Sequence, residues 1–511
     1  MSVETSRGVA PGVLEPTRRR SCFLRRSGIA LFACLVAGCV TSGVDEYPLP
    51  PSTDVFVPSV WSAETATGTM VSSVAALQAA IDAALPGQTI VLADGTYRDG
   101  TLLLGASGIT VQSQTPGGVR LDGAQHVVVT GNRNVLRGFQ FASGDIGDDT
   151  VIDVTGSDNT LTQLSFDGYR ARRYLHFAAG SHGNELSFSN ISRKSAEPIG
   201  PAIQINTSPA VAGYHRIRYC AFRDFPGPGG DHGNEPIRIG LGEERANPSR
   251  TLVEHCYFSR VGTGDSESVS VKSSENMCRY NTFTDNPGGM LVFRAGNRNV
   301  AYGNFFLAGA GGVRTKEGHG HDVVNNYFET GAADALRVEY VSSDPAADIR
   351  VVHNTFVNMG VIDLGGQGPV GMLFANNLFD KPGALIFSND NGKTSFVGNL
   401  SRGILGMTIP SGMTSIDPML ERSEDGYLVP AAKSPALDGA NEQVPDLLRV
   451  DGIEGDPAVN LDISGQPRPE VKSQRDVGCS ERQLTPGAPR LRPLDLRRVG
   501  PVYLGGPPIA K

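Results

Sequence analysis

The sequence predicts an all-β fold: a single-stranded, right-handed parallel β-helix with an N-terminal capping helix. A phenylalanine recurs about every 23 residues, which suits one coil of three short strands and their turns. Glycine is frequent, at 63 of 511 residues, whereas only 7% of the residues are aromatic. This composition favours turns and strands, and the hydrophobic share of 39% is that of a folded chain.

The N-terminus has the pattern of a bacterial lipoprotein signal peptide, predicted to span residues 1–38. Five arginines between residues 18 and 26 precede an apolar run that is too short to cross a bilayer. The run ends in "LVAGC", Leu35 to Cys39, which resembles a lipobox and predicts a lipid on Cys39. An ordinary secretory signal is the alternative. Val40 after the cysteine favours the outer membrane, in the periplasm or at the cell surface, and the Pro/Ser/Thr-rich residues 39–65 predict a flexible tether.

A solenoid needs a cap at its end, and residues 72–87 provide the pattern of a capping helix. Apolar residues recur at helical spacing after a serine N-cap, and Pro86-Gly87 ends the helix. The apolar positions are Val74, Leu77, Ile81 and Leu85. The main domain is predicted over residues 66–500, with coils over about 88–405 and a wrapping region over about 405–500, where the phenylalanine period fades.

The repeat sets a register for the interior of the coils. Its apolar positions are Phe141, Phe166, Phe188, Phe222, Phe258, Phe283, Phe305, Phe328, Phe356, Phe379 and Leu400. Asparagine recurs two positions earlier at 281, 326, 354 and 377, which predicts a hydrogen-bonded ladder that Gly303 and Gly398 interrupt. The two long steps, before Phe222 and Phe258, predict loops of about ten extra residues each.

Cysteine content and charge exclude some classes of protein. Cys220 and Cys256 share one register in neighbouring coils, so they are interpreted as small interior stackers, with a disulfide as the alternative. The net charge of −8 gives no general basic field, so no nucleic-acid partner is expected.

The same register brings charged residues together. Lys272 lies 11 residues before Phe283 and Arg294 lies 11 before Phe305, so the two cations should stack in adjacent coils, with Glu317 in the next. Asp265 and Glu267 lie two apart on one strand face just upstream. Such a pair is either a solvated strand face, neutralised by the two cations, or a ligand pair for a hard cation such as Ca²⁺.

Six ordered motifs resemble polysaccharide lyase family 6, which contains alginate lyases and chondroitinase B. They are "NEPIRIG" at 234–240, "DSESVSVKSS" at 265–274, "ENMCRYNTF" at 275–283, "MLVFRAGN" at 290–297, "GGVR" at 311–314 and "HDVVNNYF" at 321–328. The resemblance covers about residues 70–400. It implies a lyase that cleaves 4-O-linked uronate polymers by Ca²⁺-assisted β-elimination, with alginate as the expected substrate and chondroitin or dermatan sulfate as the alternative.

The resemblance also assigns roles to residues. Lys272 matches the base, and Arg294 matches the arginine that acts as acid or stabilises charge. Asp265 and Glu267 match two acidic Ca²⁺ ligands, and Asn234 is chosen as the third, although many relatives carry that Asn where this chain has His232. Asp265 is one methylene shorter than the glutamate usual there.

Further residues are expected at the substrate groove. Arg238 and Arg314 are expected to bind substrate carboxylates, and Tyr280 or a water is the candidate proton donor. His321 is either a substrate contact or a structural loop histidine. A β-helix glycoside hydrolase and a non-catalytic carbohydrate-binding surface protein are the alternatives from other classes.

Overall fold

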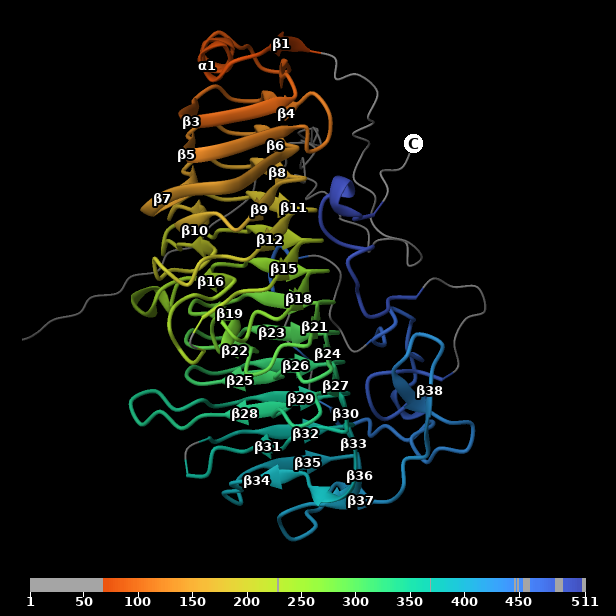
Figure 1. Cartoon of the computed structure of the whole chain (residues 1–511). Coiled ribbons are helices and arrows are strands. Elements are labelled where there is room, and N and C mark those ends of the chain that lie inside the picture. Colours follow the sequence, from red (N-terminus) through yellow and green to blue (C-terminus); the bar gives the residue numbers. More distant parts are fainter. Residues whose placement is uncertain are drawn as a thin grey trace, which may run out of the picture. The chain divides into compact units, whose positions relative to one another are not determined.

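In most coils the chain contributes three short strands, and equivalent strands of successive coils pair in parallel. The computed structural model describes residues 68–507, except 228, 368, 445–446, 448–449, 454–459 and 483–489. The fold is mostly β, a parallel β-solenoid of about 13 turns with little helix (Figure 1). The predicted fold class is confirmed. Residues 1–67 lie outside the described residues, and with them the predicted signal peptide, Cys39 and the whole predicted tether.

The strands form three rows along the solenoid. The first row is a 14-stranded sheet: β1 (Thr69–Val71), β2 (Thr89–Leu92), β4 (Thr110–Ser113), β6 (Val135–Arg137), β8 (Thr160–Thr162), β11 (Glu185–Ser187), β14 (Arg216–Arg218), β17 (Leu252–Glu254), β20 (Met277–Arg279), β23 (Val300–Tyr302), β26 (Asp322–Val324), β29 (Arg350–Val352), β32 (Leu373–Ala375) and β35 (Ser395–Val397). The second row contains β9 (Ser165–Asp167), β12 (Asn190–Ser192), β15 (Ala221–Arg223), β18 (Tyr257–Ser259), β21 (Thr282–Thr284), β24 (Phe305–Leu307), β27 (Tyr327–Glu329), β30 (Thr355–Val357), β33 (Leu378–Leu385), β36 (Asn399–Ile404) and β37 (Met413–Ser415).

The third row carries the candidate site. It contains β10 (Arg170–Phe177), β13 (Ile203–Ile205), β16 (Ile237–Ile239), β19 (Glu267–Val271), β22 (Met290–Phe293), β25 (Val313–Thr315), β28 (Leu336–Val338), β31 (Ile362–Asp363) and β34 (Phe387–Ser388). In the first coils three long strands bridge the second and third rows: β3 (Gly95–Leu104), β5 (Val119–Val129) and β7 (Phe139–Val154).

A short helix, α1 (Val74–Asp82), lies at the N-terminal end of the solenoid (Figure 1). Ser73 caps it, because its hydroxyl accepts the amide of Ala76 at 3.1 Å. Leu77 and Ile81 are fully buried and join the main core, which closes the first coil. Leu85 lies beyond the helix and is 66% exposed, so its predicted place on the buried face is wrong.

The interior is built on a stack of aromatic rings. Phe258, Phe283, Phe306, Phe328 and Phe356 stack with ring centroids 4.6–4.8 Å apart, the spacing of paired strands. The stack therefore passes through Phe306, one residue after the position that spacing predicts.

Two further positions of the predicted stack are also shifted. Phe166 pairs with Ile191 rather than with Phe188, and Phe379 pairs with Ser401 rather than with Leu400. Phe188 instead stacks on Tyr219, in a separate line of rings. Residue spacing alone cannot decide which of two neighbouring apolar residues enters the core. Alternate residues of a strand point inward and outward, and this direction decides it.

Buried asparagines form the predicted ladder, and it has no interruption at the two predicted places. Each side-chain oxygen accepts the backbone amide of the preceding member at 2.8–3.0 Å. The ladder comprises Asn281, Asn304, Asn326, Asn354, Asn377 and Asn399. The prediction that Gly303 and Gly398 break the ladder is wrong. In these two coils the ladder passes through the next residue, Asn304 or Asn399, just as the aromatic stack passes through Phe306 instead of Phe305.

The cysteines within the described residues are unpaired. Cys220, Cys256, Cys278 and Cys479 are free and buried. Cys220 and Cys256 pack inside successive coils as predicted, and the disulfide alternative is wrong.

After β37 the chain turns back along the solenoid. A short antiparallel pair follows, β38 (Leu420–Arg422) with β39 (Leu428–Pro430). The returning backbone then donates to earlier and earlier coils, from Gly478 to Asn376 O, from Leu494 to Thr282 Oγ1 and from Val502 to Gln163 Oε1. Three short 3₁₀ helices complete the described elements: η1 (Gly242–Glu244), η2 (Lys472–Gln474) and η3 (Val502–Leu504). Within residues 68–507, no described helix has the length and apolar character needed to span a membrane.

Candidate active site

Lys272 and Arg294 directly follow β19 and β22, which are neighbours in the third row. Val271 pairs with Phe293 in the parallel ladder, so the two cations occupy the next, equivalent position. The amide of Arg294 donates to Val271 O at 2.8 Å, and the amide of Lys272 donates to Ile239 O at 2.7 Å. The predicted stacking of the two side chains in adjacent coils is therefore present.

In the next coil the same position is held by Lys316. Phe293 pairs with Thr315, so the residue after Thr315 continues the line. Glu317, which spacing predicts for this position, instead lies 2.9 Å from Arg245. The prediction is wrong because the stack residue Phe328 lies 12 positions after Lys316, whereas Phe283 lies 11 positions after Lys272.

Lys272 is largely enclosed beside a carboxylate. Its side chain is 19% exposed, and its Nζ lies 3.8 Å from Glu235 Oε1. Arg238 binds both oxygens of Glu235, with its Nε 3.1 Å from Oε1 and its Nη2 2.5 Å from Oε2. Burial, then Arg238 and Arg294, lower the pKa of Lys272 below the usual value for lysine, against opposing effects of Glu235 and Glu267. A lysine in this setting loses its proton more readily than a solvated one.

Two guanidinium groups converge on Glu267. Arg294 Nη1 donates to Glu267 Oε1 at 2.6 Å, and Arg314 Nη2 donates to the same oxygen at 2.5 Å. Both arginines also bind Asp231, Arg294 at 2.7 Å and Arg314 at 3.2 Å. Ser266 donates to Asp231 as well. The two acids thus clamp the two arginines in one orientation.

The charges of this cluster reinforce one another. Burial opposes a charged guanidinium, but Glu267 and Asp231 outweigh it and raise the pKa of Arg294. Burial also opposes ionisation of Asp231, yet Ser266, Arg314 and Arg294 hold the pKa of Asp231 well below its usual range. Arg294 therefore remains cationic throughout the ordinary pH range.

Asp265 is buried and turned toward backbone amides. Its Oδ2 accepts the amides of residues 232, 233 and 234 at 3.1, 2.7 and 3.0 Å, and its Oδ1 accepts the amide of Glu267 at 2.9 Å. Burial and the nearby charge of Glu235 raise the pKa of Asp265 to about 6, despite these hydrogen bonds. Burial therefore favours the neutral form of the Asp265 carboxyl more than it does in a solvated aspartate.

The residues predicted to bind Ca²⁺ fit a hard cation by their chemistry. Asp265, Glu267 and Asn234 form an oxygen-only donor set. Glu267 Oε2 is buried and has no hydrogen-bond partner among the described residues. Asn234 Oδ1 accepts one amide, from Gly200 at 3.0 Å, so it keeps a second lone pair, as Asp265 Oδ1 does. The unsatisfied oxygen of Glu267 and these spare lone pairs are donors that suit a bound cation.

The other predicted residues fall into two groups. Arg238 and Arg314 lie in the charge cluster described above. His321 and Tyr280 do not: both are interior residues, and none of their described contacts is with Lys272, Arg294 or Glu267.

His321 has the contacts of a structural histidine. Its Nδ1 accepts the amide of Asn299 at 3.2 Å, its Nε2 lies 3.2 Å from Glu317 O, and its ring packs on Phe293. Burial lowers the pKa of His321 to about 4, which keeps the ring neutral. The structural alternative for His321 is the one that its contacts support.

Tyr280 belongs to the ring line between the first and second rows. Its ring packs against His255 and Tyr302, and the Arg279 guanidinium lies 5.5 Å from its centroid. Tyr280 is only 5% exposed, so its hydroxyl is not at the surface that carries Lys272 and Arg294.

Sequence reasoning missed Asp231, Glu235 and Lys194. Asp231 lies in the long loop that the wide step before Phe258 predicts, but no spacing reveals the partners of a loop residue. Lys194 is a second buried lysine, which donates to the carbonyls of Ser195 and Pro198 at 3.2 and 3.3 Å. Burial lowers the pKa of Lys194 to about 8, but the side chain is 1% exposed and supports a loop rather than facing the groove.

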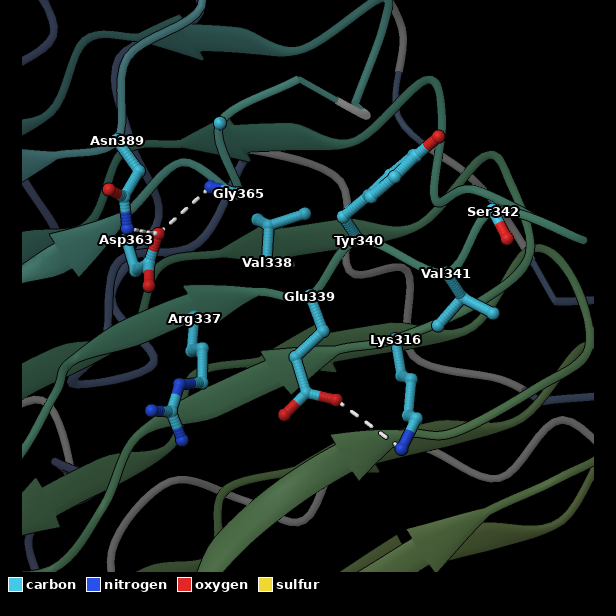
Figure 2. A pocket seen from close by; sticks show the side chains of 11 residues that line it. Lys316, Arg337, Val338, Glu339, Tyr340, Val341, Ser342, Asp363, Gly365 and Asn389 are labelled. Carbon is cyan, nitrogen blue, oxygen red and sulfur yellow. Dashed lines mark hydrogen bonds and ion pairs between the residues drawn. The ribbon is translucent and has the colours of Figure 1, made fainter.

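An open pocket of about 850 Å³ has Lys316 in its wall (Figure 2). Lys316 follows Lys272 and Arg294 in the line of equivalent positions. Lys316 and Arg337 contribute cations to its wall, and Glu339 and Asp363 contribute carboxylates. Lys316 Nζ lies 3.4 Å from Glu339 Oε2. The pocket wall therefore carries charges of both signs beside apolar side chains such as Val338 and Tyr340.

The chain is similar to known proteins in sequence and in fold. The sequence profile of the chondroitinase B family matches residues 71–362. The fold is similar to that of AlyGC, a family 6 alginate lyase, with 25% identity, a TM-score of 0.64 and coverage of 76% of this chain. The chain spans 58% of the length of AlyGC. A search of the curated proteins gives no significant match.

Two other structures share the fold. The alginate lyase AlyF-OU02, solved in complex with G6, is 17% identical, with a TM-score of 0.60 and coverage of 72% of this chain and 90% of its own. A mannuronic acid specific family 6 lyase from the human gut microbiota is 23% identical, with a TM-score of 0.58 and coverage of 68% of this chain and 91% of its own.

Proposed function

Since the chain belongs to the chondroitinase B family, polysaccharide lyase family 6, we propose that it cleaves 4-O-linked uronate polymers by β-elimination, with alginate as substrate. The observation that carries the proposal is Lys272, a lysine with a lowered pKa that stacks beside the clamped Arg294 at the third-row groove. The similarity to AlyGC supports alginate. Chondroitin and dermatan sulfate are the competing substrates, because the family profile is that of chondroitinase B.

Lys272 acts as the base. The proton on C5 of the uronate is α to a carboxylate and is weakly acidic, so the base must be neutral and close. Burial and Arg238 favour the neutral amine of Lys272. When Nζ takes the C5 proton, the electrons of that C–H bond form the C4–C5 double bond, and the C4–O bond to the next sugar breaks.

Arg294 and Arg314 supply positive charge where the reaction needs it. As C5 loses its proton, negative charge develops on the uronate carboxylate, and fixed cations that need no reorganisation stabilise it. Asp231 and Glu267 keep both guanidinium groups in place before substrate arrives. Arginine hardly deprotonates, so the proton for the leaving oxygen comes from a water or from the protonated Lys272.

Lyases of this family often use Ca²⁺, and we assign a Ca²⁺ site to this chain as part of the proposal. Asn234, Asp265 and Glu267 would hold the ion, which would supply further charge stabilisation for the substrate carboxylate. Glu267 would belong both to the arginine cluster and to the Ca²⁺ site. One of its oxygens binds Arg294 and Arg314, and the other has no partner among the described residues.

The direct test is an assay of the purified protein on alginate, polymannuronate, polyguluronate, chondroitin sulfate and dermatan sulfate. A lyase product carries an unsaturated uronate, whose absorbance rises during the reaction. We expect the rise with alginate or with one of its two homopolymers. A rise only with dermatan sulfate would show that dermatan sulfate, and not alginate, is the substrate. New reducing ends without the absorbance would show that the protein is a hydrolase.

We also propose that the protein is a lipoprotein of the outer membrane, anchored through Cys39. The support is the lipobox-like "LVAGC" and the basic region before it. Metabolic labelling with palmitate should label the protein, and Cys39→Ala should abolish the label. Export of unlabelled protein would indicate an ordinary secretory signal.

A further inference from the structure

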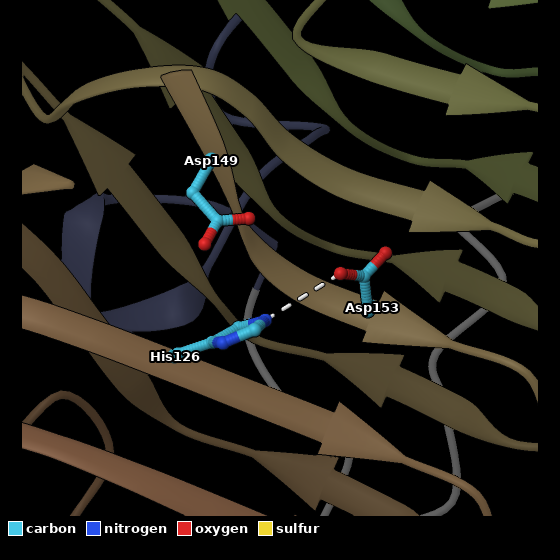
Figure 3. A group of neighbouring side chains, drawn as sticks. All are labelled: His126, Asp149 and Asp153. Atoms are coloured by element: carbon cyan, nitrogen blue, oxygen red, sulfur yellow. Dashed lines mark hydrogen bonds and ion pairs between the residues drawn. The ribbon is translucent and has the colours of Figure 1, made fainter. Parts of the chain in front are cut away.

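A cluster of metal-binding side chains lies outside the proposed active site. His126, on β5, faces Asp149 and Asp153, both on β7 (Figure 3). One ligand atom from each of the three lies within 4.8 Å of the others. His126 Nε2 lies 3.4 Å from Asp153 Oδ2, about the edge of a tetrahedron with bonds of roughly 2.1 Å, the length of zinc–nitrogen and zinc–oxygen bonds.

An irregularity in strand pairing brings the cluster together. Between the pairs Gly123–Gly144 and Val127–Ile152, three residues of β5 (124–126) lie opposite seven residues of β7 (145–151). The extra length of β7 carries Asp149 beside His126, whereas a regular ladder would move Asp149 further along the sheet. Bulges of this kind redirect side chains and are typical of functional positions.

A second layer of hydrogen bonds orients Asp153. His176 Nδ1 lies 2.8 Å from Asp153 Oδ1, and His176 Nε2 lies 2.8 Å from Asn206 Oδ1. Asn206 Nδ2 in turn donates to Glu244 Oε1 at 2.8 Å, which fixes the orientation of its amide. These hydrogen bonds occupy Oδ1 of Asp153 and leave its Oδ2 directed at His126. Carboxylate ligands of metals are commonly held in this way by outer partners.

We propose that His126, Asp149 and Asp153 bind a divalent transition-metal ion of the zinc class, with His176 as the outer residue that orients Asp153. One imidazole and two carboxylates suit Zn²⁺ better than Ca²⁺, which takes oxygen ligands. Asp149 is exposed, so rotation of its side chain closes the remaining gap to the other two ligands. A fourth position stays open to water or to an anionic ligand.

The place of the cluster suggests what the open position would bind. Asp153 pairs with His176, His176 with Gln204, Gln204 with Arg238 and Arg238 with Ser270, all in the third row. Ser270 lies two residues before Lys272, so the metal site lies four strand spacings from the base, roughly 19 Å along the same face.

Without a metal, the aspartates in this part of the face would repel an acidic polymer. Arg173 lies near both aspartates: burial and Arg172 lower its pKa, whereas Asp153 and Asp149 raise it. A divalent ion would add positive charge here, and its open position could accept a uronate carboxylate. The binding of metal itself does not depend on the proposed lyase activity.

The test is calorimetric titration of metal-stripped, tag-free full-length protein with ZnCl₂. We expect one equivalent of Zn²⁺ to bind. His126→Ala and Asp153→Asn should weaken binding at least about 100-fold, and His176→Gln roughly 10- to 100-fold, as removal of an outer partner does. Asp145→Asn is the matched control, because Asp145 lies on the same bulge but binds Arg170 at 2.8 Å. Its affinity for Zn²⁺ should equal that of the unmodified protein.

The outcomes separate a metal site from an ion pair. No Zn²⁺ binding by the unmodified protein, or equal binding by His126→Ala, would overturn the proposal and leave only a surface His126–Asp153 ion pair. Binding of a CaCl₂ equivalent that His126→Ala abolishes, without binding of ZnCl₂, would overturn the metal class. If a variant fails to fold by circular dichroism, titration of the unmodified protein with Co²⁺ still decides, since a bound tetrahedral ion gives visible absorption bands and free hexahydrated Co²⁺ gives only weak ones.

Discussion

Glu235 Oε1 lies 3.8 Å from Lys272 Nζ, and this pairing brings a loop acid to a lysine of the strand row. Glu235 does not act as a full counter-ion for Lys272, because Arg238 binds both of its oxygens. A free glutamate at this distance would stabilise the ammonium and raise the pKa of the lysine. The Arg238–Glu235 pair instead gives Lys272 a nearly neutral neighbour, and burial then favours the uncharged amine.

Lys272→Ala should lower kcat by roughly 10²- to 10⁴-fold, the usual range for loss of a general base, with little change in the far-UV circular dichroism spectrum. The initial rate of absorbance increase on alginate measures this effect. Lys472→Ala is the control, because Lys472 is exposed and lies in η2, in the C-terminal region that follows the coils. Turnover by Lys272→Ala within a few-fold of normal would require another base.

Arg238→Gln should shift the pH dependence of kcat/KM. The neutral amine of Lys272 is the active form, so activity rises as pH passes upward through its pKa. Loss of Arg238 removes one cation and frees Glu235, and both changes favour the ammonium and raise the pKa of Lys272. The rising limb of the profile should therefore move to higher pH.

Arg298→Gln is the control for this shift, because Arg298 is exposed and lies 3.7 Å from Glu275. An unchanged pH profile for Arg238→Gln, with a raised KM, would indicate that Arg238 binds substrate instead of tuning the base.

Asp231→Asn should lower kcat more than it changes KM. Asp231 holds Arg294 at 2.7 Å and Arg314 at 3.2 Å, so its loss frees two cations that the reaction needs in fixed positions. A misplacement of about 1 Å can cost roughly 100-fold in rate, so we expect a loss of about 10- to 100-fold.

Asp224→Asn serves as the control for Asp231, because Asp224 starts the same long loop but binds Arg260, at 2.6 Å. A lower KM with unchanged kcat would contradict a positioning role and show that Asp231 competes with the substrate carboxylate for the arginines.

Removal of Ca²⁺ with a chelator should lower the lyase rate, and added Ca²⁺ should restore it. A bound ion also stabilises the fold, by about 2.7 kcal/mol at a free concentration 100 times its Kd, so the midpoint of thermal unfolding should rise with Ca²⁺. Glu267→Gln removes the charge next to the unpartnered oxygen and should abolish this rise. If chelation changes neither the rate nor the midpoint, Asn234, Asp265 and Glu267 do not form a Ca²⁺ site.

Much of the fold and the main pair of the site could be predicted from the sequence. The repeat specifies the number of residues per coil, and parallel stacking then converts equal spacing into contact, which places Lys272 beside Arg294. The capping helix was predictable because its N-cap serine and apolar spacing are local signals.

The remaining errors have two physical causes. Adjacent apolar residues such as Phe305 and Phe306 both satisfy a spacing rule, and only the direction of each side chain decides which one enters the core. Loop residues such as Asp231 and Glu235 follow no period, so their charge pairs with Arg294 and Lys272 require the three-dimensional structure.

Asn304→Ala should destabilise the protein by about 2–4 kcal/mol, because it removes a fully buried ladder member whose neighbours then lose partners. Asn304 Oδ1 accepts the amide of Asn281 at 3.0 Å, and its Nδ2 donates to Cys278 O at 2.9 Å. In urea the midpoint of unfolding should fall without a change in the m-value. Asn297→Ala is the control in the same coil: its Oδ1 accepts one amide near the surface, from His319 at 3.0 Å, so the expected loss is under about 1 kcal/mol. Equal midpoints for the two variants would show that the ladder contributes little to stability and that the aromatic stack holds the coils together.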